Sequence, residues 1–254
     1  KEVSDKAKEY DADLAAARAK LAKRIGEAGG FEDAVALARL DTRLEVMMAD
    51  QKKYAAELGV KRVRLTGGEP TLRSDLLEIV DRLHRVDGIT DLGMTTNAIL
   101  LPDLAGPLRA AGLSRINIHL DTLDPQRLKR VMRFGSFEHI WAGIEAAEAA
   151  GFAPIKLNAV VVRDYNEHDV VELARLTIDR DWHVRFIELM PLGGGECAGL
   201  SLSQYVPNPE TRERIETQLG PLGELLNGNP SDEARNFRLH GAKGVVGFIS
   251  PVSE

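Results

Sequence analysis

Cysteine is the scarcest chemically active residue in this chain, because only one, Cys197, occurs among 254 residues. A single thiol excludes an internal disulfide, and it excludes zinc or iron–sulfur sites whose ligands are several cysteines of this chain. The six histidines show no HxH or HExxH spacing, so the sequence gives no sign of a metal pair. A metal site built from this chain alone is therefore not expected.

Long apolar runs are also missing. No run approaches the roughly 18 to 20 residues of a membrane span, and the N-terminus lacks the apolar core of a signal peptide. We therefore expect a cytoplasmic protein with no membrane partner. The net charge of -6 is modest, so no chain-wide field favours nucleic acid, and an anionic ligand needs a local group of cations. The length and the 44% hydrophobic content leave room for one large α/β domain or two small ones.

Residues 1–58 differ in composition from the rest of the chain. They are rich in Ala, Lys, Glu and Arg, and Leu14, Leu21 and Ile25 recur at helical spacing before a stop at Gly29 and Gly30. A second helix is predicted from about Phe31 onward. We expect residues 1–58 to form a helical segment that carries no chemistry.

From residue 59 onward, strands and helices alternate with a period of roughly 30 residues, which is typical of βα units and a parallel sheet. Strands are expected at residues 61–66, 91–96, 114–120, 155–162 and 183–189. Helices are expected near Ser74, near Pro102, after an N-cap at Asp124, through residues 137–151, and after an N-cap at Asn166. Five consecutive βα-type strands predict an α/β fold with a half or full barrel.

Polar residues recur at the carboxyl ends of these strands, where a parallel barrel places its chemistry. They are Gly67, Gly68, Glu69, Thr95, Thr96, Asn97, His119, Asp121, Asn158, Glu188 and, with them, Met190. The glycine pair in "RVRLTGGEPTLR" is either a tight turn before a helix or an opening through which backbone amides approach a ligand. The strand cations are Arg64, Lys156 and Arg185. They serve a ligand, face helices or solvent, or pair inside the fold with the carboxylates of Glu69, Asp121 and Glu188.

Several blocks of sequence, taken in order and spacing, resemble one known family. The blocks are "VKRVRLTGGEPTLRSDL", "DLGMTTNAILL", "AGLSRINIHLDTLD", "IKLNAVVVRDYNEHD" and "RFIELMPLGGGE". They resemble the GTP 3',8-cyclases of molybdenum cofactor biosynthesis, which are radical S-adenosylmethionine enzymes, and the resemblance runs from about residue 55 to residue 254. It implies a partial radical-SAM-type (β/α) barrel core over residues 59–254, preceded by the helical segment of residues 1–58.

The resemblance also implies ligands and the residues that bind them. S-adenosylmethionine and a [4Fe-4S] cluster are the family's cofactors, GTP is its substrate, and a homodimer is its usual assembly. Carried over by motif, the S-adenosylmethionine site would include Gly67, Gly68, Glu69, His119 and Met190. The GTP site would include Arg64, Thr95 and Lys156. Of these, Arg64 and Lys156 supply the local cations that a triphosphate needs. In this family a deoxyadenosyl radical abstracts the C3' hydrogen of GTP, and the C3' radical attacks C8 of guanine.

The chain departs from this family at its metal ligands. The family binds one cluster through three cysteines after its first barrel strand and a second cluster through three cysteines near the C-terminus. Residues 1–58 contain no cysteine, and Cys197 matches neither group. No cluster is therefore expected in this chain, and we predict that it does not turn over GTP.

Two further departures lie beside the expected ligands. His119 stands where the family usually has a serine, and Ala98 stands where its TTNG turn has glycine. The first change adds bulk and a titratable ring at a strand end.

Two other functions remain open at this point. The barrel core could be a non-catalytic scaffold or an engineered derivative with residual GTP or S-adenosylmethionine binding. It could also be a different parallel-barrel enzyme, such as an aldolase with Lys156 as a Schiff-base lysine. The ordered blocks argue against the aldolase.

Overall fold

The computed structural model describes residues 59–132, 135–190, 202–225 and 234–250. Most of these residues belong to one compact unit made of Arg62–Arg85 and Thr90–Glu254. The predicted helices of residues 1–58 lie outside the described residues, as does Cys197.

An eight-stranded sheet forms the centre of the unit, with the strand order β1-β2-β3-β4-β5-β8-β7-β6. Its strands are β1 Arg62–Leu65, β2 Asp91–Thr96, β3 Arg115–His119, β4 Ile155–Val161, β5 Trp182–Glu188, β6 Leu222–Glu224, β7 Arg235–Leu239 and β8 Val245–Ile249. Strands β1 to β5 are parallel neighbours in chain order, and β8 adds a further parallel strand beside β5. The antiparallel strands β7 and β6 complete the sheet.

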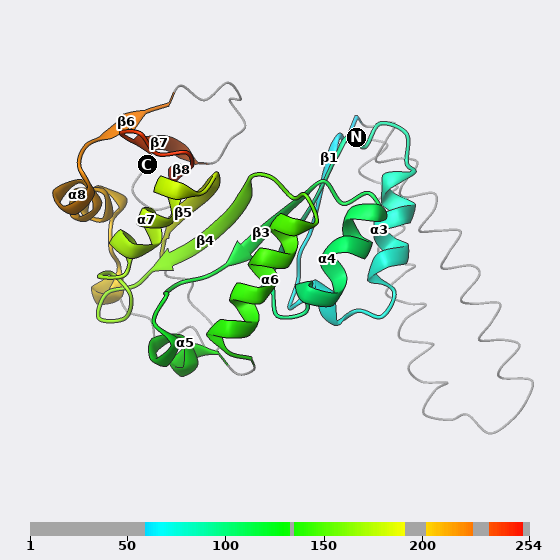
Figure 1. The fold of residues 1–254 in the computed structure, drawn as a ribbon, viewed down its shortest axis with the longest axis horizontal. Coiled ribbons are helices and arrows are strands. Elements are labelled where there is room, and N and C mark those ends of the chain that lie inside the picture. The colour runs from blue at the N-terminus through cyan, green and yellow to red at the C-terminus, as the bar shows by residue number, and fades with distance from the viewer. Residues whose placement is uncertain (1–58, 133–134, 191–201, 226–233, 251–254) are drawn as a thin grey trace, which may run out of the picture. The chain divides into compact units, whose positions relative to one another are not determined.

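The helices follow the strands in βα units (Figure 1). They are η1 Pro70–Leu72, α3 Leu76–His84, α4 Leu101–Ala110, α5 Pro125–Val131, α6 Phe137–Ala149, α7 Val170–Asp179, η3 Leu202–Gln204 and α8 Asn208–Leu219. The expected α/β class and the five adjacent parallel strands of a partial (β/α) barrel are confirmed. Within the described residues, no helix has the length and apolar character needed to cross a membrane.

The two faces of the parallel strands differ in polarity because successive side chains alternate between faces. On β3 and β4, one face carries Ile116, Ile118, Leu157 and Ala159, all nearly fully buried in the hydrophobic core. The helices pack against this apolar face. Fully burying such an aliphatic side chain contributes about 1.5 to 3 kcal/mol. Polar side chains occupy the opposite face, which is therefore the face available for a ligand.

Helix α6 packs very closely against the turn that follows β2. A Cβ placed at Gly143 of α6 would lie 2.0 Å from the backbone oxygen of Ala98. Ala98 itself has a φ of 67°, in the left-handed region where glycine has no steric penalty. The alanine noted in the sequence at this turn therefore adopts the backbone conformation that glycine would favour.

The predicted helix caps gave mixed results. Asp124 is the N-cap of α5, because its carboxylate accepts hydrogen bonds from the backbone amides of Gln126 and Arg127. The prediction for Asn166 was wrong, because Asp169 is the N-cap residue of α7. The Asn166 side chain instead forms hydrogen bonds with the backbone oxygens of Asp121 and Val160 and with the backbone amide of Val162.

Strands β6, β7 and β8 and helix α8 were not predicted from the sequence. The three strands form the edge of the sheet opposite to β1. Their short lengths, three residues for β6 and five each for β7 and β8, give little periodic signal in a single sequence.

Candidate functional site

The turn after β1 is fixed to the end of β2 by a single carboxylate. Glu69 Oε1 accepts a hydrogen bond from the hydroxyl of Thr96 at 2.6 Å, and its Oε2 accepts one from the amide of Asn97 at 2.8 Å. The same carboxylate accepts from the amide of Thr71 at 3.1 Å and from its hydroxyl at 2.7 Å, which caps the short helix η1. Glu69 therefore holds the carboxyl ends of β1 and β2 together.

The backbone conformation requires glycine at only one of the two positions before Glu69. Gly67 has a φ of 144°, a conformation that residues with a Cβ rarely adopt. Gly68 has no positive φ, and a Cβ placed there would meet nothing within 4 Å. Neither backbone strain nor packing within the described residues requires glycine at position 68. The open space beside Gly68 can accommodate a ligand.

Most of the predicted binding residues on strands share the polar face of the sheet. The register pairs Thr95 with Asn117 and Asn117 with Lys156, so these three residues form one row across β2, β3 and β4. The next row toward the carboxyl ends pairs His119 with Asn158. Alternation puts both rows on the same face.

Two further residues lie on the polar face: Asn117, which the sequence did not single out, and Arg185, a strand cation for which the sequence left ligand binding open. Asn117 is 3% exposed, and its side-chain oxygen has no hydrogen-bond partner among the described residues. Arg185 on β5 is 8% exposed and donates from Nε to the side-chain oxygen of Asn158 at 2.9 Å. The spacing of Asn117 two residues before His119 was the signal that could have identified it.

Arg64 lies on the same face at the edge of the sheet, where β1 pairs it with Gly93. Its side chain is exposed, and it forms no ion pair with any described residue. The neighbouring cation Arg115, in contrast, is paired with Asp91. Arg64 is thus a cation at the surface of this face that the described part of the chain does not neutralise.

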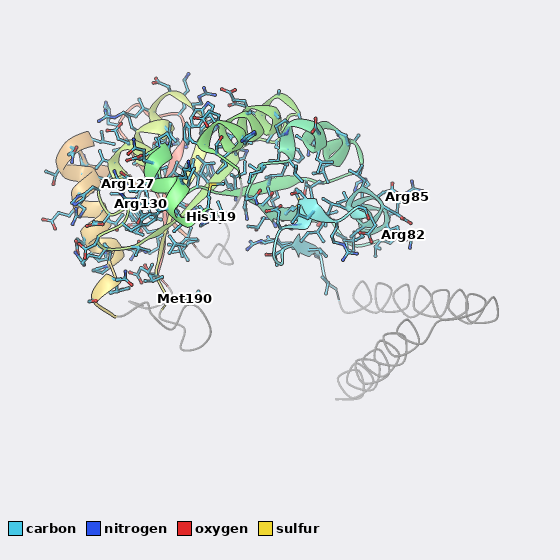
Figure 2. All side chains as sticks on the ribbon, turned by 90° about the horizontal axis from the view of Figure 1, so that it is seen from below. Arg82, Arg85, His119, Arg127, Arg130 and Met190 are labelled. Carbon is cyan, nitrogen blue, oxygen red and sulfur yellow. The ribbon has the colours of Figure 1, made fainter. Side chains whose placement is uncertain are left out.

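His119 ends β3 (Figure 2). It forms an ion pair with Asp121, with 2.8 Å between Nε2 and Oδ2. The hydrogen bond to Asp121 raises the pKa of His119 above its ordinary value, against the opposing effect of burial. Asp121 accepts from the amide of Val160 through its other oxygen at 2.8 Å. The pair therefore connects the ends of β3 and β4.

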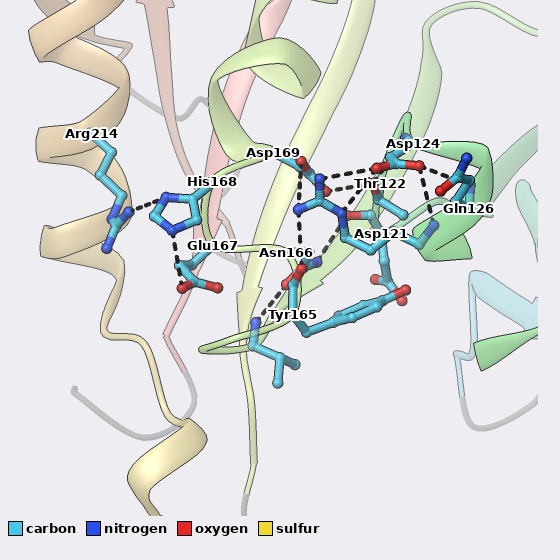
Figure 3. A network of polar contacts seen from close by, with 12 residues as sticks. Asp121, Thr122, Asp124, Gln126, Tyr165, Asn166, Glu167, His168, Asp169 and Arg214 are labelled. Carbon is cyan, nitrogen blue, oxygen red and sulfur yellow. Dashed lines mark hydrogen bonds and ion pairs between the residues drawn. The ribbon is translucent and has the colours of Figure 1, made fainter. Parts of the chain in front are cut away.

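A polar network surrounds the loop that contains Asp121 (Figure 3). The Asn166 amide donates to the backbone oxygens of Asp121 and Val160, at 2.8 and 2.9 Å. Thr122 donates to Asp169, which also pairs with Arg127 at 3.3 Å. These contacts hold the loops after β3 and β4 in place.

The remaining predicted residues, Glu188 at the end of β5 and Met190 just beyond it, do not join the polar row. Glu188 lies on the same, helix-covered face of β5 as Phe186 and Val184. Its carboxylate accepts a hydrogen bond from the amide of Asn208 at 2.9 Å. Met190 lies just beyond β5 with 48% of its surface exposed (Figure 2). Glu188 is therefore a contact to helix α8 rather than part of the polar face.

A pocket of about 260 Å³ lies between α8 and the strands β7 and β8. Its lining residues are Asn208, Pro209, Arg212, Arg235, Phe237, Phe248 and Ser250. None of them was predicted as a site residue. Among the residues with described positions, no three His, Cys, Asp or Glu side chains gather in a way that could hold a metal ion.

Comparison with known proteins decides the family. The model of the radical SAM superfamily matches residues 38–177, which is more than half of the chain. This chain belongs to the radical SAM superfamily. The match begins inside residues 1–58, whose separate domain assignment stays a prediction.

Curated relatives within the superfamily share much of this sequence. The chain is 45% identical to a GTP 3',8-cyclase of Pelotomaculum thermopropionicum over 80% of its length and 62% of the relative's. It is 41% identical to a GTP 3',8-cyclase of Moorella thermoacetica, over 88% of this chain and 66% of that protein. The chain thus spans about three fifths to two thirds of the length of these relatives. Homology to GTP 3',8-cyclases is therefore established, as the motifs predicted.

Among solved structures, the coproporphyrinogen III oxidase of Escherichia coli, described as a radical SAM enzyme, is similar over 63% of this chain and 39% of its own. The identity is 17% and the TM-score is 0.46.

Proposed function

We propose that this radical SAM chain contains the GTP-binding sheet of a GTP 3',8-cyclase. The observation that carries the proposal is the shared face of Arg64, Thr95 and Lys156, which the strand register places on the polar side of β1, β2 and β4. The identity of 45% to a GTP 3',8-cyclase supports the choice of nucleotide.

The chemistry of this face suits a triphosphate. The chain carries a net charge of -6, so a polyanion is attracted only where cations gather. Arg64 and Lys156 supply two such cations, and the Thr95 hydroxyl lies between their strands as a neutral donor. We propose that Arg64 and Lys156 bind phosphate oxygens and that Thr95 helps to orient the nucleotide.

The turn after β1 is proposed to bind S-adenosylmethionine. Gly67 and Gly68 expose backbone at the carboxyl edge, and Glu69 fixes that turn to β2. His119 and Met190 lie at the ends of β3 and β5. In this arrangement the turn would hold the amino-acid part of the cofactor, and the exposed Met190 would contact its adenine ring.

A [4Fe-4S] cluster does not fit the donor set of this chain. Such a cluster is held by several thiolates, and the chain contains a single cysteine. We therefore propose ligand binding, and not turnover, as the activity of the chain taken alone. Anaerobic reconstitution with iron and sulfide should leave less than stoichiometric iron. A stable brown protein with four irons per chain would overturn this part of the proposal.

Calorimetry with GTP tests the proposed site. Lys156→Ala should weaken GTP binding by about ten- to hundredfold, because it removes a charge-assisted hydrogen bond. Arg64→Ala should weaken it by about tenfold, since Arg64 is more exposed. Lys243→Ala, which removes an exposed cation beyond β7, is the control and should leave binding unchanged.

A scaffold without ligands is the alternative outcome of this experiment. It would be supported if GTP and S-adenosylmethionine both failed to bind while the protein was folded. The helical segment of residues 1–58, the barrel core of residues 59–254 and a homodimer are further parts of the proposal. Sedimentation of the purified chain tests the dimer.

A further inference from the structure

One exposed histidine on the polar face is paired with a carboxylate. His119 ends β3, and its side chain is 49% exposed. Nε2 lies 2.8 Å from Asp121 Oδ2, so only the second ring nitrogen remains for another partner. No other polar partner of this ring occurs among the residues that the structure describes.

Asp121 is itself immobilised, which fixes the direction of the histidine ring. Its side chain is 16% exposed. Its second carboxylate oxygen accepts from the Val160 amide at 2.8 Å, and its backbone oxygen accepts from the Asn166 side chain at 2.8 Å. Asp121 is thus held by β4 through its carboxylate and by the loop after β4 through its backbone oxygen (Figure 3). A histidine oriented by a fixed carboxylate keeps its proton more readily than a free one.

The charges of the groups around the His119–Asp121 pair determine whether the pair attracts an anion. From β2 the neighbour on the polar face is the uncharged Thr95, because Thr96 pairs with Ile118 and alternates to the other face. The Glu69 carboxylate is occupied by hydrogen bonds from the Thr96 hydroxyl and the Asn97 amide. From β4 the neighbours are Asn158 and Lys156.

Two more groups lie further out. Arg185 on β5 donates to Asn158, and the Tyr165 hydroxyl, whose pKa is raised to about 12, stays neutral beside Asp121. The negative charge of Asp121 is offset by His119, while Lys156 and Arg185 add positive charge to the same face.

We propose that His119 and Asp121 form an anion-binding pair, in which the His119 imidazolium donates its second N–H to a carboxylate or phosphate oxygen of the bound ligand. Asp121 is a positioning residue in this pair. The inference rests on the proposed function for the identity of the ligand, since the amino-acid carboxylate of S-adenosylmethionine and the phosphates of GTP offer the same oxygen chemistry.

A pH dependence follows from the sign of the histidine charge. The imidazolium donates to an anion, whereas neutral imidazole loses the charge that strengthens the bond. Affinity should therefore be constant below the raised pKa of His119 and should fall by about tenfold as the pH rises through it. Asp121→Asn keeps an oxygen acceptor for Val160 but removes the negative charge, so the fall should shift to lower pH.

The first arm of the experiment needs no nucleotide. Histidine ring resonances of the chain are followed by NMR against pH in the wild type, in Asp121→Asn and in the control His240→Gln, which changes an exposed histidine after β7. The His119 titration should move to lower pH in Asp121→Asn alone. Equal midpoints of the His119 titration in the wild type and in Asp121→Asn would contradict the proposed interaction between His119 and Asp121.

The second arm identifies the anion. Acetate and sulfate stand for carboxylate and phosphate, and S-adenosylmethionine and GTP are titrated at pH 6 and pH 9 into the wild type and His119→Gln. The proposal expects at least one of these ligands to bind about tenfold more weakly at pH 9, and His119→Gln to abolish that difference. The ligand that shows the difference is the one that contacts His119.

The outcomes separate this inference from the proposed function. If GTP and S-adenosylmethionine bind but His119→Gln retains the same pH dependence, the anion-binding pair is wrong and the proposed function stands. If only acetate or sulfate binds and shifts the His119 resonance, the pair stands and the proposed function fails. If no anion binds at either pH, both are wrong.

Discussion

At the residue scale, substitution of Gly67 tests backbone strain, whereas substitution of the adjacent Gly68 tests access of a ligand to the turn. Gly67→Ala should destabilise the protein by about 1 to 3 kcal/mol, because alanine is strained at a φ of 144°. Gly68→Ala should change the unfolding free energy by less than about 0.5 kcal/mol, because its Cβ enters open space. It should nevertheless weaken S-adenosylmethionine binding by at least about tenfold if the ligand occupies that space.

Urea unfolding and calorimetry on the same two variants test this prediction. Unchanged S-adenosylmethionine binding by a folded Gly68→Ala protein would mean that the turn is only a structural turn.

A second residue-scale prediction concerns a buried hydroxyl. The Tyr165 hydroxyl has no partner among the described residues, and burial, with Asp121 and Asp169 nearby, raises its pKa to about 12. Tyr165→Phe should therefore stabilise the protein by up to about 1 kcal/mol at pH 7, since it removes an unsatisfied polar group.

The pH dependence of that stability has a defined sign. A raised tyrosine pKa means that the folded state keeps its proton while the unfolded state loses it, so wild-type stability should fall between pH 10 and about 12. The fall should be smaller in Tyr165→Phe. Destabilisation by more than about 1 kcal/mol at pH 7 would show that the hydroxyl has a partner.

Residue-scale reasoning from the sequence identified ligand-face positions better than their partners. Thr95 and His119 were predicted at strand ends and Arg64 and Lys156 as cations on strands, and the register with alternation then places all four on one face. The sequence did not predict that Asp121 would hold His119, because the angle at which a strand turns into its loop is not a local property. Asn166 was misassigned for a similar reason, since its backbone partners come from β4 and from the loop after β3.

At the element scale, the contact between α6 and the turn after β2 is the tightest constraint. Gly143→Ala should destabilise the protein by about 2 to 3 kcal/mol or more, because the added Cβ would meet the Ala98 oxygen at 2.0 Å. Ala142→Ser, one residue earlier on the exposed side of α6, is the control and should cost about 0.5 kcal/mol.

Thermal unfolding monitored by circular dichroism distinguishes these two variants. Equal stability of Gly143→Ala and the wild type would show that α6 does not approach β2 as closely as described.

Helix α8 depends on charge for its attachment to the loop after β4. Glu210 receives hydrogen bonds from Arg163 at 2.8 and 3.1 Å and from Arg214 at 2.9 Å. Arg163 and then Arg214 lower the pKa of Glu210 to about 2. A lowered pKa stabilises the fold above the unfolded value of 4.5, and this stability is lost as the pH falls toward about 2.

Glu210→Gln should therefore cost about 1 kcal/mol at pH 7, a value reduced by solvent at this partly exposed pair. The difference from the wild type should shrink below pH 4. Glu213→Gln on the exposed side of α8 is the control. Urea unfolding at pH 7 and pH 3 measures both, and a difference that is equal at the two pH values would contradict the assignment.

The element predictions succeeded where periodicity was strong. Five strands, the helix through residues 137–149 and the Asp124 cap followed from alternation, spacing and capping chemistry. Strands β6 to β8 did not, because each is too short to show a period. Strands β6 and β7 also pair antiparallel, outside the βα pattern, whereas β8 pairs in parallel with β5. Glu188 was placed at the expected strand end but faces α8, since an assignment of strand face depends on a register that one sequence does not reveal.

At the scale of the whole molecule, an acidic chain presents cations on one face of its sheet. The net charge of -6 gives no attraction for a nucleotide, whereas the polar face combines Arg64, Lys156 and Arg185 across β1, β4 and β5. The apolar face of the same strands is covered by helices and is closed to a nucleotide. The family and the fold were predictable from ordered motifs, but only the strand register showed that these cations share a face.

The position of GTP in a crystal structure of its complex with this chain tests the central claim most directly. We expect the triphosphate on the polar face, with phosphate oxygens within hydrogen-bonding distance of Arg64 and Lys156 and the nucleotide beside Thr95. GTP bound instead in the pocket between α8, β7 and β8, or a fully soaked crystal with an empty polar face, would contradict it.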